Sequence, residues 1–157
     1  MRYLKIACIW VLSLLANSVF SADFQPKITY FYDGDTVKIQ DGPLTYKLRF
    51  TDIDAPERNQ AYGKKSKRAL VKLCKHAQVQ VRIVGVDKYH RQLGQLTCNQ
   101  RSVNEFMVAN GHAWFNQRYS ADIALAQAEF TARQQKRGLW QQKYPMPPWV
   151  WRQRHPH

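Results

Sequence analysis

Acidic residues are scarce in this sequence. The 11 aspartate and glutamate residues are outnumbered by 24 lysine and arginine residues, so the formal net charge is +13. A field of this sign attracts polyanions and speeds their association with the protein. Nucleic acid is the polyanion that a small exported enzyme most commonly meets, although an anionic membrane or cell wall also fits the charge.

Repeats, low-complexity linkers and clusters of cysteine and histidine are missing as well. His76, His90 and His112 are scattered, and we interpret them as incidental, which argues against a structural zinc site. The 157 residues, 45% of them hydrophobic, suffice for one folded domain with a core. We expect a single domain at residues 22–157, monomeric and without a stable protein partner.

No apolar run is long enough to predict a membrane span. The start has the parts of a secretory signal at residues 1–21: Arg2 and Lys5 precede the apolar run Ile6 to Leu15, and Ser21 offers a cleavage site before Ala22. A retained anchor is the alternative. Cleavage removes two basic and no acidic residues, which lowers the net charge from +13 to +11. We expect a basic protein, secreted or periplasmic, that does not contact the membrane after cleavage.

Only three cysteines are present, and cleavage of the signal removes Cys8. The remaining two, Cys74 and Cys98, are expected to form one disulfide in an oxidising compartment. Such a bridge stabilises the fold by roughly 3 kcal/mol on the chain-entropy estimate. Two buried free thiols are the alternative.

The first half of the chain alternates between apolar and polar residues, as strands do. Turn signals at Asp33-Gly34 and Asp41-Gly42 separate three such runs, and a second hairpin is predicted further on. The predicted strands are Ile28 to Tyr32, Thr36 to Gln40, Leu44 to Thr51, Val79 to Ile83 and Gln92 to Cys98. Five strands with helices between them predict an α+β fold around a small β-barrel.

Three helices are predicted between and after these strands. The first spans about Gly63 to His76 and has a basic outer surface. Ser102 and Glu105 form a capping box for a short second helix. Ser120 can cap a third helix that runs to about Arg137.

The segment Asp33-Gly34-Asp35-Thr36 lies between two predicted strands. Its simplest interpretation is a tight turn in which Gly34 takes an unusual backbone conformation. The functional alternative is that Asp35, at the start of a rigid strand, binds a hard divalent cation through its carboxylate. Asp33 and Thr36 would then support the ion indirectly, through a water or a neighbouring group.

The segment Asp54-Ala55-Pro56-Glu57 also has two interpretations. Asp54 at a helix N-cap, with Glu57 three residues later, is a capping box. Alternatively, because Asp54 follows a strand whose end can face the start of another in a barrel, its carboxylate would meet that of Asp35. Two carboxylates, a carbonyl group and several waters suit calcium.

Arg49 and Arg91 could supply the cations of a phosphate site. Arg49 lies in a strand, where arginine usually only reaches the surface or forms an ion pair, and Arg91 lies in a turn, where it is usually solvated. If both reach one cleft, their guanidinium groups can hold phosphate oxygens and stabilise a phosphorane-like transition state. Glu57 is the candidate base for the attacking water. Together these groups predict a metal-dependent phosphodiesterase.

These clusters resemble those of the staphylococcal (micrococcal) nuclease, or thermonuclease, family. The likeness covers about residues 27–152, and the joint occurrence of the motifs is highly specific. The matching segments are Tyr32-Asp33-Gly34-Asp35-Thr36-Val37-Lys38, Leu48-Arg49-Phe50, Asp52-Ile53-Asp54-Ala55-Pro56-Glu57, Asp87-Lys88-Tyr89-His90-Arg91, Ser102-Val103-Asn104-Glu105, Gly138-Leu139-Trp140 and Pro147-Pro148-Trp149-Val150-Trp151-Arg152.

The resemblance implies a five-stranded OB-fold barrel with three α-helices. It also implies a calcium-dependent, sugar-non-specific endonuclease that cuts DNA and RNA to leave 3′-phosphate ends. On the family pattern the catalytic residues are Arg49, Glu57 and Arg91. The calcium ligands are Asp35, Asp54 and the backbone carbonyl group of Ala55, and the contacts to a terminal phosphate are Lys88 and Tyr89.

The chain departs from the family pattern in three places. Ala55 replaces a threonine, which leaves the carbonyl group available. His90 replaces a glycine before Arg91, which can alter how that arginine is presented. The segment after Glu57 is shorter than in the type member.

Two further expectations concern the substrate. Because the loop is short, any steering of phosphate falls to Lys64 and Lys65. An aromatic side chain that stacks on a base is expected between Trp114 and Tyr119.

A catalytically silent OB-fold module that binds single strands is the rival interpretation. Such a module is expected to have lost Arg49, Glu57 or Arg91, whereas the sequence retains all three. The complete set favours the enzyme.

Overall fold

The structure is a computed structural model that describes residues 25–156. The predicted signal segment, residues 1–21, lies outside this part of the chain. No helix of the described part is both long and apolar enough to cross a membrane.

Most strands belong to one mixed sheet. Its order is β1-β2-β3-β6-β5, with β7 paired to β6, and a separate small sheet pairs β4 with β8. The strands are β1 Lys27–Phe31, β2 Thr36–Asp41, β3 Leu44–Phe50, β4 Ile53–Asp54, β5 Val79–Val86, β6 Gln92–Cys98, β7 Arg101–Ser102 and β8 Trp114–Phe115. The five long strands lie where the alternation predicts them, and the α+β OB-fold class is confirmed. Within the described residues the sheet is not closed into a barrel, because no pairing joins β5 to β1.

A parallel pairing brings two distant parts of the chain together. β3 pairs with β6 through Leu48 opposite Gln92, Arg49 opposite Leu93 and Phe50 opposite Gly94. Arg91 immediately precedes β6, so the two arginines singled out by the sequence lie on neighbouring strands of this sheet. The register of the ladder therefore sets their separation.

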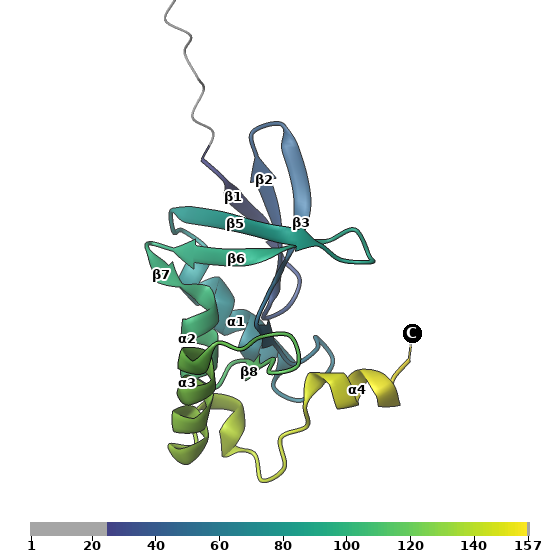
Figure 1. Ribbon diagram of the computed structural model, residues 1–157, viewed down its shortest axis with the longest axis vertical. Helices are drawn as coiled ribbons and strands as arrows, with labels where there is room; N and C mark the ends of the chain where they lie inside the picture. The colour runs from purple at the N-terminus through teal and green to yellow at the C-terminus, as the bar shows by residue number, and fades with distance from the viewer. Residues whose placement is uncertain (1–24, 157) are drawn as a thin grey trace, which may run out of the picture.

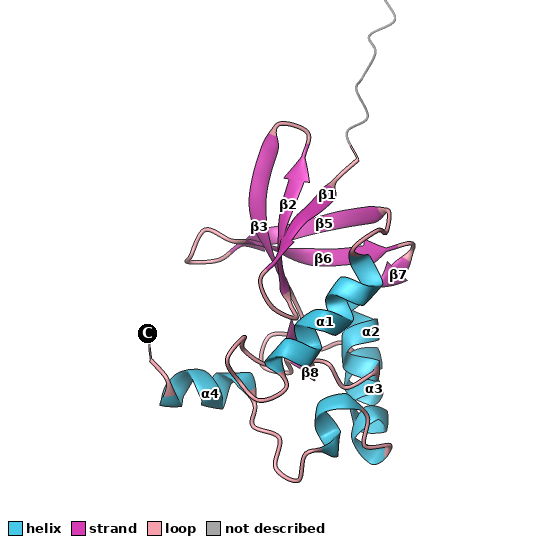
Figure 2. Cartoon of the chain, turned by 180° about the vertical axis from the view of Figure 1, so that it is seen from behind, coloured by secondary structure: helices cyan, strands magenta, loops and turns pink. Residues whose placement is uncertain are grey.

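The helices gather at one end of the sheet (Figures 1 and 2). They are α1 Gly63–Cys74, α2 Val103–Ala109, α3 Ile123–Gln134, the 3₁₀ helix η1 Gly138–Gln141 and α4 Pro148–Arg154. Two details differ from the sequence-based expectation. The cap of α3 is Asp122, whose carboxylate accepts from the Leu125 N–H at 3.0 Å, and Ser120 instead accepts from the Asp122 N–H at 3.3 Å. The helix α4 was not predicted.

Apolar side chains from the sheet and the first three helices form one core. Leu48 and Phe50 of β3, Leu70 of α1 and Met107 of α2 are at most 1% exposed. The predicted disulfide is present between Cys74, the last residue of α1, and Cys98, the last residue of β6. The bridge ties α1 to the sheet.

Gly34 is required by a close approach rather than by its backbone angles. It does not lie in the left-handed region, unlike Gly42, Gly111 and Gly138, so the unusual conformation expected for it is absent. A side chain at this position would meet the Ser66 hydroxyl at 1.9 Å. The absence of a side chain lets the start of β2 pack directly against α1.

Candidate active site

One cleft of about 760 Å³ collects the functional candidates of the sequence. It lies between the start of β2, the end of β3, the loop between β5 and β6, and α4. In both ribbon views α4 and the β5–β6 loop project on the same side of the molecule (Figures 1 and 2). The predicted residues that line it are Asp33, Asp35, Thr36, Arg49, Asp54, Ala55, Glu57, Lys88, Tyr89 and Arg91.

Asp35 is a buried carboxylate at the start of β2, only 4% exposed. Its Oδ2 accepts from the Ala55 N–H at 2.6 Å and its Oδ1 accepts from the Thr36 hydroxyl at 3.0 Å. Asp33 accepts from the Asp35 N–H at 3.0 Å. Burial raises the pKa of Asp35 to about 7, and the neighbouring Arg49 opposes this rise. A cation beside Asp35 therefore stabilises the ionised form.

Arg49 joins the two buried aspartates. Its Nε lies 3.2 Å from Asp35 Oδ1, and its Nη2 lies 3.0 Å from Asp54 Oδ1. Its Nη1 donates to the backbone carbonyl groups of Phe50 and Ile53, the latter at 2.9 Å. The guanidinium therefore has a fixed position at the bottom of the cleft, since most of its N–H groups are already paired.

Asp54 does not cap a helix. It pairs with Trp114 in the small sheet and is 2% exposed, and the next helix begins only at Gly63. The capping-box interpretation of this segment is therefore wrong. The carboxylate faces the cleft, where it meets Arg49 from one side and Arg152 of α4 from another.

Arg152 is the site residue that the sequence analysis missed. Its Nη2 lies 2.7 Å from Asp54 Oδ2, and its Nη1 donates to Asp54 Oδ1 at 3.1 Å and to Glu57 Oε1 at 2.7 Å. These hydrogen bonds, those to Asp54 above all, raise the pKa of Arg152 against the effect of its burial. The motif that carries Arg152 was noticed in the sequence, but only as a likeness to other proteins.

Glu57 is more accessible than the aspartates, with a side chain 33% exposed. Its backbone N–H donates to Gln60 Oε1 at 3.0 Å. Gln60 in turn donates from Nε2 to the Met146 carbonyl at 2.6 Å, which links this loop to the segment before α4. The carboxylate thus sits on an anchored loop at the mouth of the cleft.

Arg91 is held within its own turn. Its Nε and Nη2 both lie 2.7 Å from Asp87 Oδ2, and its backbone N–H donates to Asp87 Oδ1 at 3.0 Å. Partial burial raises the pKa of Asp87, but hydrogen bonds, chiefly those from Arg91, together outweigh it, so the pKa lies below its usual value. The exposed ring of Tyr89 lies under both neighbouring cations, with Arg91 at 5.6 Å and Lys88 at 5.0 Å from the ring centre.

His90 lies in the left-handed region with φ of 59°. This conformation favours glycine, which explains the glycine of the family pattern at this place. Histidine is among the residues that tolerate the left-handed region. The turn around His90 is held by Asp87, which accepts hydrogen bonds from the backbone N–H groups on either side, those of Tyr89 and Arg91.

Lys64 and Lys65 do not reach the cleft. They line a second cavity at the start of α1. Of the aromatic segment Trp114 to Tyr119, only Asn116 and Tyr119 line the cleft, and Tyr119 is 75% exposed whereas Trp114 is buried. Tyr119 is therefore the one aromatic residue of that segment placed to stack on a base in this cleft.

Asp35 and Asp54 offer the donor set of a hard cation. Both are buried oxygen ligands, and a single guanidinium already contacts both carboxylates from between them. Among the described residues there is no group of three or more histidine, cysteine or acidic side chains that could hold a metal. The two aspartates fit calcium when backbone carbonyl groups and waters complete its coordination.

Comparison with known proteins shows which family this chain resembles. Residues 47–142 match the family described as staphylococcal nuclease homologue. An uncharacterized endonuclease of Escherichia coli O157:H7 is 39% identical over 145 residues, which are 92% of this chain and 95% of the relative. A micrococcal nuclease of Shigella flexneri is 35% identical over 146 residues, which cover 83% of this chain and 82% of the relative. A probable staphylococcal-like nuclease of rice, Oryza sativa subsp. japonica, is 40% identical over 68% of this chain but only 29% of the relative.

The nucleases among these relatives support endonuclease activity, a hydrolytic reaction on nucleic acid. The shared region includes the end of β3 with Arg49, the Asp54 to Glu57 segment and the Arg91 turn. The chain belongs to the staphylococcal nuclease family.

Proposed function

We propose that the protein is a calcium-dependent, sugar-non-specific endonuclease that hydrolyses phosphodiester bonds of DNA and RNA and leaves 3′-phosphate ends. The observation that carries the proposal is the convergence of Arg49, Glu57 and Arg91 with two buried aspartates in a single cleft. Loss of any of these groups would be compatible with a module that only binds nucleic acid. Their joint presence supports catalysis.

The proposed roles of the side chains follow from their positions. Arg49, fixed at the bottom of the cleft, and Arg91, at its wall, would donate hydrogen bonds to non-bridging phosphate oxygens. These bonds become stronger as negative charge grows on the oxygens in the transition state. Lys88 and Tyr89, next to Arg91, would contact a neighbouring terminal phosphate.

Glu57 would take a proton from the attacking water. The water oxygen bonds to phosphorus, the bond from phosphorus to the 5′ oxygen breaks, and that oxygen takes up a proton from solvent, to which Glu57 later returns the proton it holds. The products are one strand with a 3′-phosphate and another with a 5′-hydroxyl group. Glu57 is suited to this role because it is the accessible carboxylate at the mouth of the cleft.

Asp35, Asp54 and the Ala55 carbonyl group would hold the calcium ion, with Asp33 and Thr36 positioning the Asp35 carboxylate. Calcium, when bound, supplies positive charge next to the phosphate. Arg152 holds Asp54 and Glu57 in the structure described here. Its contact with Glu57 has to open before that carboxylate oxygen can accept a proton.

The test is digestion of single-stranded DNA, duplex DNA and RNA by the protein without residues 1–21, with calcium or with a calcium chelator. We expect cleavage only with calcium, and 3′-phosphate ends on all three substrates. The Glu57→Gln variant should lose a factor of about 10² to 10⁴ in rate, as for removal of other general bases.

Glu105→Gln is the matched control, because this glutamate lies on α2 and does not line the cleft. It should cleave at the wild-type rate. Tight, salt-sensitive binding without cleavage by the wild-type protein would assign it to the silent binding modules instead.

Export completes the proposal. Residues 1–21 would act as a cleaved signal peptide, and the Cys74–Cys98 disulfide is compatible with an oxidising compartment. Mass determination of the protein from a periplasmic or medium fraction would check this, with an N-terminus at Ala22 expected.

A further inference from the structure

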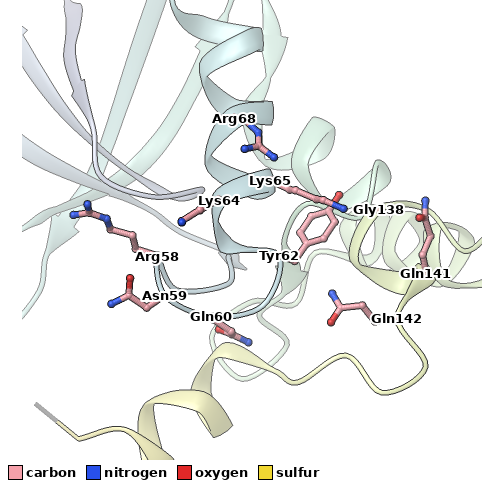
Figure 3. A pocket seen from close by; sticks show the side chains of 10 residues that line it. All are labelled: Arg58, Asn59, Gln60, Tyr62, Lys64, Lys65, Arg68, Gly138, Gln141 and Gln142. Carbon is pink, nitrogen blue, oxygen red and sulfur yellow. The ribbon is translucent and has the colours of Figure 1, made fainter.

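A second cavity, of about 590 Å³, lies next to the candidate active site along the chain. It is formed by the loop after Glu57, the first turns of α1 and the η1 segment (Figure 3). Four basic side chains line it, and none of the lining residues is acidic. The basic residues are Arg58, Lys64, Lys65 and Arg68, which are all exposed.

These four cations have no carboxylate partner in the part of the chain that the structure describes. Within residues 25–156, none of them forms an ion pair with a carboxylate, whereas Arg49, Arg91 and Arg152 in the cleft all do. The cavity therefore carries a positive charge that the protein itself does not offset. Such a surface offers a binding site to an anion.

Three of these cations, Lys64, Lys65 and Arg68, lie on α1, and their placement destabilises that helix. α1 contains no acidic residue, and Lys64 and Lys65 lie in its first turn, at the positive end of the helix macrodipole. Lys64, Arg68 and Lys72 also follow one another at intervals of four residues, where like charges repel. A negatively charged ligand in the cavity would relieve both effects.

The cavity walls are held in place without such a ligand. Tyr62 lines the cavity, and its hydroxyl group lies 3.0 Å from His112 Nδ1. Gln60 bonds both to the Glu57 backbone and to the Met146 carbonyl, which fixes the loop that carries Arg58. The backbone segments that carry the basic side chains are thus held by hydrogen bonds within the protein.

The arrangement fits a chain of phosphates better than a single one. Lys64 and Arg68 are separated by one helical turn, roughly 6 Å along the axis, which is on the scale of neighbouring phosphates in a nucleic-acid strand. Arg58 directly follows Glu57, so the cavity begins one residue from the proposed base. The loop that carries the proposed base therefore continues directly into the wall of the cavity.

We propose that this cavity is an accessory binding site for the phosphate backbone of the substrate strand, outside the nucleotides next to the cleaved bond. The inference rests on the proposed function, since it assumes that the cleft receives a polynucleotide. If the cavity binds the strand in this way, the protein should bind long strands more tightly than short ones.

The test compares two double variants of equal charge. Lys64→Gln/Arg68→Gln alters the cavity, and Lys38→Gln/Arg82→Gln removes one lysine and one arginine from exposed positions of β2 and β5 that line neither cavity. Binding of labelled oligothymidylates of about 4 and about 16 nucleotides is measured by fluorescence anisotropy with a calcium chelator present, over a range of salt concentrations.

For the cavity variant we expect roughly a tenfold loss of affinity for the longer strand and a shallower salt dependence. The slope of log K against log salt should decrease by about 1.4, the value for two lost contacts with a single strand. The shorter strand should lose little. The control variant should behave as the wild type with both strands.

Two results would overturn the proposal: an equal loss in both double variants, which would mean a general charge effect, or no loss in either. Thermal unfolding measures whether the cavity variant is folded. Its unfolding midpoint should not fall, because the substitutions remove charge repulsion in α1.

Binding without cleavage would refute the endonuclease activity but not this accessory site. Normal cleavage with unchanged salt slopes would refute this site alone.

Discussion

Arg152 holds the carboxylates that we propose for calcium and for the base. It lies 98 residues from Asp54 in the sequence, yet contacts both oxygens of that carboxylate. A guanidinium and a calcium ion at the same carboxylate repel each other. Calcium binding and the contacts of Arg152 are therefore expected to compete.

We predict that Arg152→Gln binds calcium roughly tenfold more tightly, which corresponds to the loss of about one charge-assisted hydrogen bond from the competing state. Without calcium, the variant should be less stable than the wild type by about 1–2 kcal/mol, a modest loss because the arginine side chain is 44% exposed. Isothermal titration with calcium and urea unfolding measure the two quantities.

Arg154→Gln provides the control for this prediction. Arg154 is exposed on the same helix and does not line the cleft. Its removal should change neither quantity. Identical calcium affinities for the two variants would show that Arg152 does not compete with the ion.

At the scale of elements, α1 is joined to the turn after α2 by a pair of contacts. The Ser66 hydroxyl donates to the His112 carbonyl at 2.7 Å, and the Tyr62 hydroxyl meets the ring of the same histidine. Burial lowers the pKa of His112 from its usual value of 6.5. The folded protein therefore resists protonation of this ring.

Acidification should weaken this junction. Below about pH 6.5 the unfolded chain takes up a proton at His112 before the folded chain does, so stability falls as the pH decreases through and below that value. We predict that, between pH 7.5 and about pH 5, the urea midpoint of the wild type falls relative to that of His112→Gln. Asp35 has a raised pKa, so its contribution to stability increases on acidification. Both proteins contain Asp35, and its contribution therefore cancels in the difference between their urea midpoints.

His76→Gln is the matched variant for that comparison. This histidine is exposed just after α1 and should leave the wild-type pH dependence intact. If wild type and His112→Gln respond to pH alike, His112 is not the group that titrates.

Which elements the sequence predicts depends on how local their determinants are. The long strands and α1 follow from alternation and helical periodicity within one segment. Asp35 and Glu57 follow as candidates from short residue clusters that resemble those of the family. By contrast, α4 has only seven residues, and its one local signal is Pro148 at the first position. The roles of Arg152 and His112 depend on partners far away in the sequence, and no local pattern carries them. His112, interpreted as incidental, proves to be a junction residue.

At the scale of the whole molecule, the disulfide joins the end of α1 to the end of β6. Cys74 and Cys98 are separated by 24 residues and are at most 2% exposed. Closing a loop of this size restricts the unfolded chain. Removing the bridge should therefore affect stability more than the geometry of the cleft.

We predict that Cys74→Ala/Cys98→Ala lowers the free energy of unfolding by about 3 kcal/mol, as measured with guanidinium chloride. Its nuclease activity at low temperature should remain close to that of the wild type. The oxidised protein without residues 1–21 should show no titratable thiol after denaturation. Two thiols in that assay, or an unchanged unfolding curve, would contradict the prediction.

The parallel pairing of β3 with β6 has an evolutionary consequence. Because Arg49 and Arg91 are spaced by a hydrogen-bonded ladder, the loop between Glu57 and α1 can lengthen or shorten without moving one guanidinium relative to the other. A slip of the ladder by one residue, however, would turn each side chain to the opposite face of the sheet. Insertions in the loop between Glu57 and α1 should therefore disturb the arginine pair less than single-residue insertions within either strand.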